Sequence, residues 1–112
     1  MGATEIQGEF EHLVLLSVMR LGAAAFTSSI VVEIEERAGR DVAPAAVYVA
    51  LRRLEAKDLV SSDIRRDDDA GQLRERRFFS LTSSGLEALR TSRARLGRLW
   101  AGFEGLLGEA GS

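Results

Sequence analysis

The stretch that decides the fold is VAPAAVYVALRRLEAKDLVSS, residues 42–62. Its proline, Pro44, is the only one in the chain and suits the first turn of a helix, where its missing N–H needs no partner. A helix from Pro44 to about Asp58 gathers three apolar residues on one face, which we expect to be buried: Val47, Leu51 and Leu54. The opposite face carries small or apolar groups and two guanidiniums: Ala45, Val49, Arg52, Arg53 and Ala56, with Tyr48 on the flank.

Two helices are predicted before this stretch. Apolar residues recur at helical spacing between residues 6 and 21, and Gly22 follows them as a C-terminal cap. Ile30, Val31 and Ile34 belong to a shorter amphipathic helix of about three turns that ends at Gly39.

A hairpin is predicted after it. Residues 59–66 and 76–82 have the partly alternating pattern of strands, and residues 67–72 are predicted as a rather long, charged loop. Three helices followed by a hairpin is the order of a winged helix-turn-helix. The predicted fold is therefore mainly α with a small β-hairpin, followed by a long C-terminal helix.

That last helix is predicted from about Ser83 to about Leu107. Apolar residues follow one another in steps of four and three, in a heptad-like seam that Arg93 interrupts: Leu89, Leu96, Trp100, Phe103 and Leu107. Leu99 stands beside this seam, and Gly97, Ala101 and Gly105 form a second row of small residues. We expect the helix to pack against its own copy, so that residues 1–82 form a winged helix-turn-helix domain and residues 83–112 a dimerisation helix. A pocket for a flat aromatic ligand at Leu96 and Trp100 is an alternative that can coexist with a dimer.

Composition excludes several classes of function. The chain has 112 residues, a formal charge of −2, no cysteine and one histidine, His12, so disulfide scaffolds, cysteine nucleophiles and histidine-rich metal sites are excluded. No sequence motif of a catalytic or nucleotide site is present, and we expect neither enzymatic activity nor a cofactor or metal. No signal peptide or membrane span is recognisable, which predicts a cytoplasmic protein without a membrane partner.

Positive charge is concentrated locally despite the negative total. Residues 44–57 contain Arg52, Arg53 and Lys57 against one acid, and the hairpin adds Arg65, Arg66, Arg74, Arg76 and Arg77. Guanidiniums pair with phosphates and, from a helix in the major groove, with guanine edges. Ala45 and Val49 suit thymine methyl groups, and Tyr48 can donate to a phosphate. These residues, with Pro44, predict a surface for double-stranded DNA, although three aspartates at 67–69 would repel a phosphate backbone.

Four segments together resemble the PadR family of bacterial transcriptional regulators. They are GEFEHLVLL (8–16), AF with EIEERAGR (25–26 and 33–40), the opening stretch 42–62, and RRFFSLTSSG (76–85). Three features depart from the family pattern: Ala43 stands where a serine-like cap is common, the tyrosine-glycine usual at Phe26 and Thr27 is absent, and Asp58 replaces a glycine before Leu59. Asp58 thus stands where a positive φ is favoured.

The resemblance implies a homodimeric repressor of the short subgroup with a single C-terminal helix. It implies that the third helix reads a pseudo-palindromic operator, with Tyr48, Ala45, Val49 and Arg52 meeting the DNA. The wing would touch the backbone, the last helix would dimerise, and a small effector such as a phenolic acid or drug would release the operator. Two other functions stay open from the residues alone: a winged helix that binds protein, and a small-molecule sensor that does not read an operator.

Overall fold

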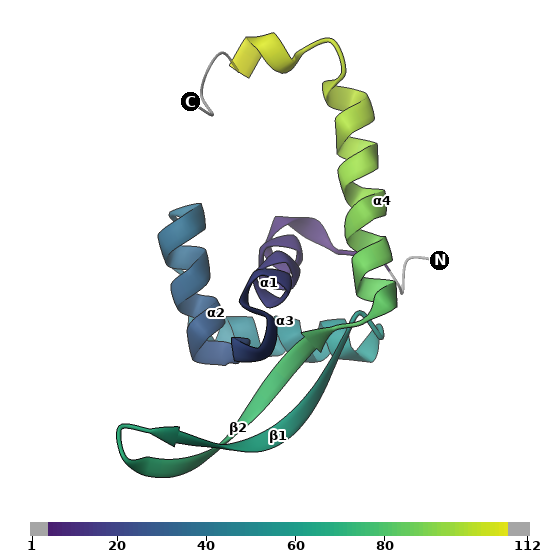
Figure 1. Cartoon of the computed structure of the whole chain (residues 1–112). Helices are drawn as coiled ribbons and strands as arrows, with labels where there is room; N and C mark the ends of the chain where they lie inside the picture. Colours follow the sequence, from purple (N-terminus) through teal and green to yellow (C-terminus); the bar gives the residue numbers. More distant parts are fainter. Residues whose placement is uncertain (1–4, 108–112) are drawn as a thin grey trace.

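The chain folds into three helices, a long antiparallel hairpin and a fourth helix that rises beside them (Figure 1). The computed structural model describes residues 5–107. The elements are α1 (Gly8–Leu21), the 3₁₀ turn η2 (Gly22–Ala24), α2 (Thr27–Glu33), the π-helical turn η3 (Ile34–Ala38), α3 (Pro44–Ala56), β1 (Val60–Asp69), β2 (Gln72–Leu81), α4 (Ser83–Trp100) and the 3₁₀ turn η4 (Glu104–Leu107). The predicted fold class and winged helix-turn-helix order are confirmed.

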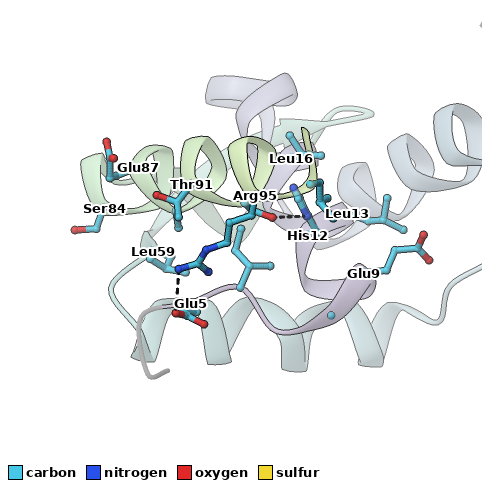
Figure 2. A pocket seen from close by; sticks show the side chains of 15 residues that line it. Glu5, Glu9, His12, Leu13, Leu16, Leu59, Ser84, Glu87, Thr91 and Arg95 are labelled. Carbon is cyan, nitrogen blue, oxygen red and sulfur yellow. Dashed lines mark hydrogen bonds and ion pairs between the residues drawn. The ribbon is translucent and has the colours of Figure 1, made fainter. Parts of the chain in front are cut away.

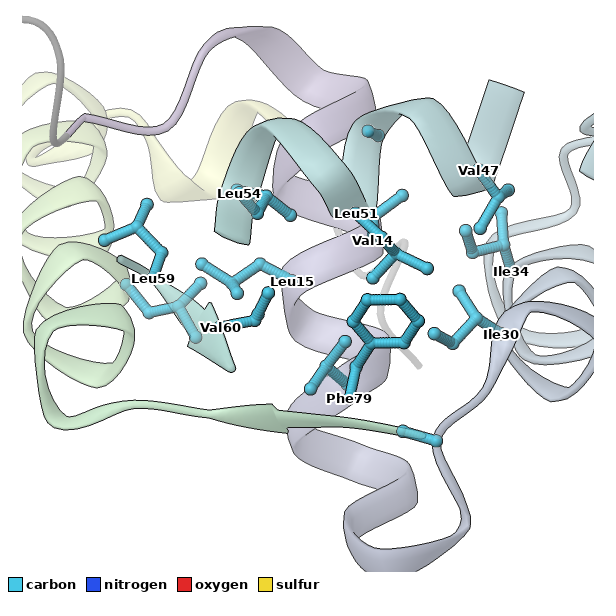
Figure 3. Packing of buried hydrophobic residues seen from close by; sticks show 14 residues of the cluster. Val14, Leu15, Ile30, Ile34, Val47, Leu51, Leu54, Leu59, Val60 and Phe79 are labelled. Carbon is cyan, nitrogen blue, oxygen red and sulfur yellow. The ribbon is translucent and has the colours of Figure 1, made fainter. Parts of the chain in front are cut away.

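The core lies where α1, α2, α3 and β2 meet. The predicted inner face of α3 is buried, with Val47, Leu51 and Leu54 fully removed from solvent. Figure 3 shows these side chains facing residues from the neighbouring elements: Val14, Leu15, Ile30, Ile34, Leu59, Val60 and Phe79. Burial of these apolar side chains, each contributing about 1.5–3 kcal/mol, fixes α3 in place and turns its other face outward.

The second helix ends earlier as a regular α-helix than the apolar pattern predicts. α2 stops at Glu33 and continues as the π-helical turn η3 up to Gly39, which takes a left-handed conformation with φ 66°. Just before α2, Phe26 forms a β-bridge with Phe78, and the backbone N–H of Phe79 donates to the carbonyl of Ala25 at 2.9 Å. This pairing attaches the start of α2 to the hairpin.

The predicted long loop at the hairpin tip is wrong. The strands pair continuously from Val60 with Leu81 to Asp69 with Gln72, so only Ala70 and Gly71 form the turn. Both residues have positive φ, 55° and 80°, which is the pattern of a type I′ turn. Because this two-residue turn matches the twist of the strands, the backbone ladder extends through a segment whose charged side chains favour a loop.

The last helix is shorter than predicted. α4 ends at Trp100, where the seam was expected to continue to Leu107. Ala101 is extended, with ψ 127°, and Gly102 has φ 88°, so the chain turns before η4. Glycine lowers the stability of a helix, and the segment Ala101–Gly105 holds two of them. The predicted row of Gly97, Ala101 and Gly105 therefore does not lie on one helix.

The start of α4 is joined to the end of α3 through Thr82 and Gly85. The Thr82 hydroxyl caps α4 by accepting from the Gly85 N–H at 2.9 Å, and it donates to the Asp58 carbonyl at 2.7 Å. The Thr82 N–H donates to the Leu59 carbonyl at 3.2 Å. A Cβ on Gly85 would lie 2.1 Å from the Leu59 oxygen, so only glycine permits this approach of α4.

We predict that Gly85→Ala lowers the free energy of unfolding by about 3 kcal/mol, because the added methyl group collides with backbone. Gly97→Ala is the matched control, since this glycine lies in the same helix with no atom within 4 Å of an added Cβ. The control should stabilise the fold by up to about 1 kcal/mol. Urea unfolding of both variants measures the difference, and equal midpoints would contradict the packing described for Gly85.

Candidate nucleic-acid interface

The outward face of α3 is the first part of the candidate surface. Pro44 occupies the first turn, and Ala43 precedes it without any side-chain cap. Val49 is 48% exposed and Tyr48 38%, and Ala45, Arg52 and Arg53 are also exposed. The structure thus places these predicted residues on one solvent-facing side of the helix, opposite the core.

A network of polar side chains connects α3 to both strands of the hairpin. Nη1 of Arg52 donates to the Tyr48 hydroxyl at 3.0 Å, and Nε of Arg52 lies 3.2 Å from Oε1 of Glu55. That carboxylate oxygen is shielded from solvent and has no hydrogen bond to any residue that the structure describes, so its contact with Arg52 is an ion pair only. The other Glu55 oxygen accepts from Ser62 at 2.7 Å, and Arg77 donates to Ser62 at 2.9 Å. The network therefore orients two arginines, one on the helix and one on the hairpin.

The Tyr48 phenol is electrostatically coupled to this network. The hydrogen bond from Arg52 lowers the pKa of Tyr48 below its ordinary value, and the charges of Arg52 and Arg77 act in the same direction. Both guanidiniums stabilise a phenolate and polarise the phenol O–H. The hydroxyl accepts from Arg52 and keeps its own hydrogen to donate elsewhere.

Strand alternation divides the hairpin arginines between its two faces. Arg77 shares a face with Ser62, Ile64 and Phe79, because paired residues lie on the same side of a pleated sheet. Arg65 and Arg76 are paired with each other on the opposite face. Their guanidiniums stack there on aromatic rings, Arg65 at 4.0 Å from the centre of Phe78 and Arg76 at 4.3 Å from that of Phe26.

The hairpin therefore does not present all its predicted DNA-binding arginines beside α3. Arg74 lies opposite Asp67 in the register, on the same face as Arg65 and Arg76. Arg66 lies on the Arg77 face.

Lys57 is not part of the exposed surface on which it was predicted. Its side chain is only 15% exposed, and its ammonium donates to Oε1 of Glu11 at 2.7 Å and to the Glu5 carbonyl at 3.0 Å. Glu11 itself is 7% exposed and also accepts from the Gln7 N–H at 2.8 Å. Lys57 thus joins the end of α3 to α1, because a buried carboxylate requires a partner for its charge.

The residues predicted for a dimer seam separate into two groups. Leu89 is buried in the core of its own chain and is therefore unavailable to a second copy. Leu96, Leu99, Trp100 and Phe103 are exposed, Leu99 to 79%, and the side chain of Leu107 lies outside the described residues. The seam that remains begins at Leu96.

A groove of about 940 Å³ runs between α1 and α4. Figure 2 shows that His12 and Leu13 of α1 face Thr91 and Arg95 of α4 across it. Arg95 pairs with Glu5 at 3.6 Å, and the Ser92 hydroxyl lies 3.4 Å from Nδ1 of His12. Leu96 also lines the groove and is the first residue of the exposed apolar segment.

Residues 5–107 hold neither a candidate metal cluster nor a candidate membrane span. This part of the chain contains no group of three or more His, Cys, Asp or Glu side chains that could hold a metal ion. None of its helices is both long and apolar enough to cross a membrane.

Comparisons with known proteins identify the class. The family model described as "Transcriptional regulator PadR-like family" matches residues 15–91, from the middle of α1 to the middle of α4. The chain therefore belongs to the PadR-like family of transcriptional regulators, which are DNA-binding proteins and not enzymes. No functionally curated protein matches the sequence.

Solved structures of the family have the same fold. A PadR-like transcription factor from Bacteroides fragilis is 26% identical, with a TM-score of 0.65 over 80% of this chain and 82% of that one. A PadR family regulator from Eggerthella lenta is also 26% identical, with a TM-score of 0.64 over 88% and 86%. A third, from Clostridium difficile, is 19% identical, with a TM-score of 0.67 over 94% and 100%, and supports the fold alone.

Sequence reasoning missed two members of the polar network. Glu55 stands three residues after Arg52, a spacing at which helical side chains form ion pairs, so this contact was available from the sequence. Ser62 carries no such signal, because its position beside Glu55 depends on how the hairpin docks on α3.

We predict that Tyr48 titrates below about 10, the ordinary value for tyrosine, because two arginine charges favour its phenolate. Tyr48 is the only tyrosine, so the ultraviolet absorbance of tyrosinate reports it directly. Arg52→Ala should raise the midpoint towards about 10. Arg53→Ala removes an equal charge that has no contact with Tyr48 and should leave the midpoint unchanged; a shift of the same size in both variants would rule out the specific hydrogen bond.

Proposed function

We propose that the chain is a homodimeric repressor that binds a pseudo-palindromic operator through α3 and the hairpin. The observation that carries this proposal is the exposed face of α3, where Arg52 and Arg53 stand among small apolar residues and Arg77 is oriented beside them. Guanidiniums supply affinity for phosphates and read guanine, and small side chains allow a helix to enter the major groove closely. The DNA-facing set is Pro44, Ala45, Tyr48, Val49, Arg52, Arg53 and Arg77.

Arg65, Arg74 and Arg76 form a second, peripheral set in this proposal. They lie on the hairpin face that turns away from Ser62 and Arg77, and two of them are engaged with aromatic rings. We assign them to phosphate contacts beside the groove, which carry no sequence information. Lys57 is left out of both sets, because its charge is used inside the protein.

The homodimer part of the proposal is supported by the apolar surface at the end of α4. Large apolar side chains are exposed close together in the chain, at the end of α4 and just after it: Leu96, Leu99, Trp100 and Phe103. Large apolar side chains exposed so close together in the chain mark an interaction site. We assign it to a second copy, with residues 83–112 as the dimerisation segment, and the α1–α4 groove lies next to it.

The third part of the proposal is that a small effector releases the protein from its operator. Trp100 is half-exposed next to Leu96, so a pocket for a small planar aromatic compound can form where two copies meet. A compound bound there would act on DNA affinity only if it favoured one arrangement of the two copies over another.

Binding to the DNA upstream of the protein's own gene, measured by fluorescence anisotropy, tests operator recognition. The logarithm of the affinity should fall with that of the salt concentration, with a slope of about 0.9 for each phosphate neutralised. Arg53→Ala should lower affinity and reduce this slope by about 1. Arg90→Ala, an exposed arginine of α4 paired with Glu87, is the matched control and should bind as the parent does. Absence of binding at about 50 mM salt, where such contacts are strong, would exclude the repressor.

Sedimentation equilibrium tests the dimer. The parent chain should show twice its mass of 12.2 kDa, and Leu96→Asp or Trp100→Ala should shift the mass towards the monomer, because a charge or a void enters the seam. Leu73→Asp changes an exposed leucine of the hairpin and should leave the mass unchanged. A dimer that persists in both α4 variants would remove the proposed seam. Quenching of Trp100 fluorescence by planar aromatic compounds, measured with the same samples, tests the effector.

A further inference from the structure

The polar contacts on α3 distinguish its two adjacent arginines. Both Arg52 and Arg53 are exposed and carry the same charge. Arg52 is held on one side by Tyr48 and on the other by Glu55, at 3.0 and 3.2 Å. The Arg53 side chain has no polar contact within residues 5–107, and it lies on the flank of the helix that faces Gln7 and Phe10 of the neighbouring segment.

Within the described residues, the contacts of Arg52 leave most of the terminal N–H donors of its guanidinium without a partner. A guanidinium has five N–H donors, and here Nε is turned to Glu55 while one hydrogen of Nη1 is used by Tyr48. The second hydrogen on Nη1 and both hydrogens on Nη2 have no partner in the described part of the chain. These are the donors of an end-on bidentate contact, the commonest specific contact of arginine with the O6 and N7 acceptors of guanine.

Glu55 is itself fixed, so the orientation of Arg52 does not depend on a flexible side chain alone. Its second carboxylate oxygen accepts from Ser62 of β1, which in turn accepts from Arg77 of β2. The hairpin thus supports Arg52 through Glu55. Preorganisation of this kind reduces the entropy lost when the arginine meets a base.

Two small apolar side chains precede Arg52 on the same exposed face of α3. Ala45 and Val49 precede it at helical spacing, and both are exposed. Val49 and Arg52 are separated by about 4.5 Å along the helix axis, which is comparable with the step of about 3.4 Å between base pairs. Methyl groups at this distance from an arginine suit the C5-methyl group of a thymine beside the guanine.

We propose that Arg52 reads a guanine in each half of the operator and that Ala45 and Val49 contact the methyl group of an adjacent thymine. Tyr48 and Glu55 are positioning residues that orient Arg52, and Arg53 binds phosphate without reading sequence. This inference rests on the proposed operator binding and specifies which bases the same surface recognises.

The test begins with selection of bound duplexes from random DNA by the full chain. In the selected site, each guanine is replaced in turn by 7-deazaguanine, which lacks the N7 acceptor, and each thymine by deoxyuridine, which lacks the methyl group. We expect one guanine position per half-site at which the parent loses affinity about tenfold, and a neighbouring thymine at which it loses affinity several-fold.

Variants assign these positions to residues. Arg52→Lys keeps the charge but not the bidentate fork, so it should retain the salt dependence and lose the preference for guanine over adenine at that position. Val49→Ala should lose the preference for thymine over deoxyuridine at the neighbouring position. Arg53→Lys is the matched control, and it should preserve both preferences.

Glu55→Gln and Tyr48→Phe test the positioning role. Each should lower the guanine preference by a smaller factor than Arg52→Lys while the salt slope stays that of the parent. Thermal unfolding of each variant confirms that it is folded before its preference is measured.

The outcomes separate this inference from the function on which it rests. If no duplex is selected, the proposed operator binding itself fails. If a site is selected and Arg52→Lys keeps the full guanine preference, operator binding stands and the assignment of Arg52 is overturned. Loss of the preference in Arg53→Lys instead would reverse the roles of the two arginines and overturn it equally.

Discussion

The close approach of α4 to the backbone at Leu59 is the constraint on which the rest of the structure depends. The Leu59 N–H donates to the Leu54 carbonyl at the end of α3, and its own carbonyl accepts from Thr82, at the junction of β2 and α4. Asp58 makes the turn possible with a φ of 64°, a conformation that aspartate adopts more readily than most residues. Four elements therefore meet at one short backbone segment, and their directions are set together.

A consequence of this junction is that the candidate DNA surface and the start of α4 are joined by direct contacts. α3 is fixed from inside by its apolar face and from the side by the hairpin through Glu55, Ser62 and Arg77. The buried pair of Lys57 and Glu11 adds a link from the end of α3 to α1. Since Glu5 contacts both Lys57 and Arg95, the N-terminal segment also connects α3 with α4.

The helical part of the fold could be predicted because its signals are local. Pro44 marks the start of α3, Gly22 and Gly39 mark the ends of the first two helical segments, and the spacing of Val47, Leu51 and Leu54 identifies the buried face. The hairpin tip and the end of α4 were predicted wrongly. At the hairpin tip, the charged composition favoured a long loop, whereas the chain makes a two-residue turn. In α4, the apolar repeat in the sequence continues past Trp100, but the backbone leaves the helical conformation at Ala101.

The residue types of the candidate site could be predicted from the sequence, whereas their arrangement in space could be predicted only in part. The side of α3 that faces solvent follows from the helical period. Which side chains remain available does not follow from it. Lys57 has the right chemistry to bind DNA and Leu89 to form a dimer, but both are used within the chain. The division of the hairpin arginines between two faces follows from the strand register, which the predicted loop had obscured.

By itself, the sequence determined the order of elements, the amphipathic faces and the family, because each depends on residue types at short, regular spacings. Tertiary structure alone decided that the hairpin supports Arg52, since Glu55 meets Ser62 only when the hairpin docks beside α3. It also decided which apolar residues of α4 are exposed. Burial is a property of how distant segments pack, so no pattern within one helix separates Leu89 from Leu96.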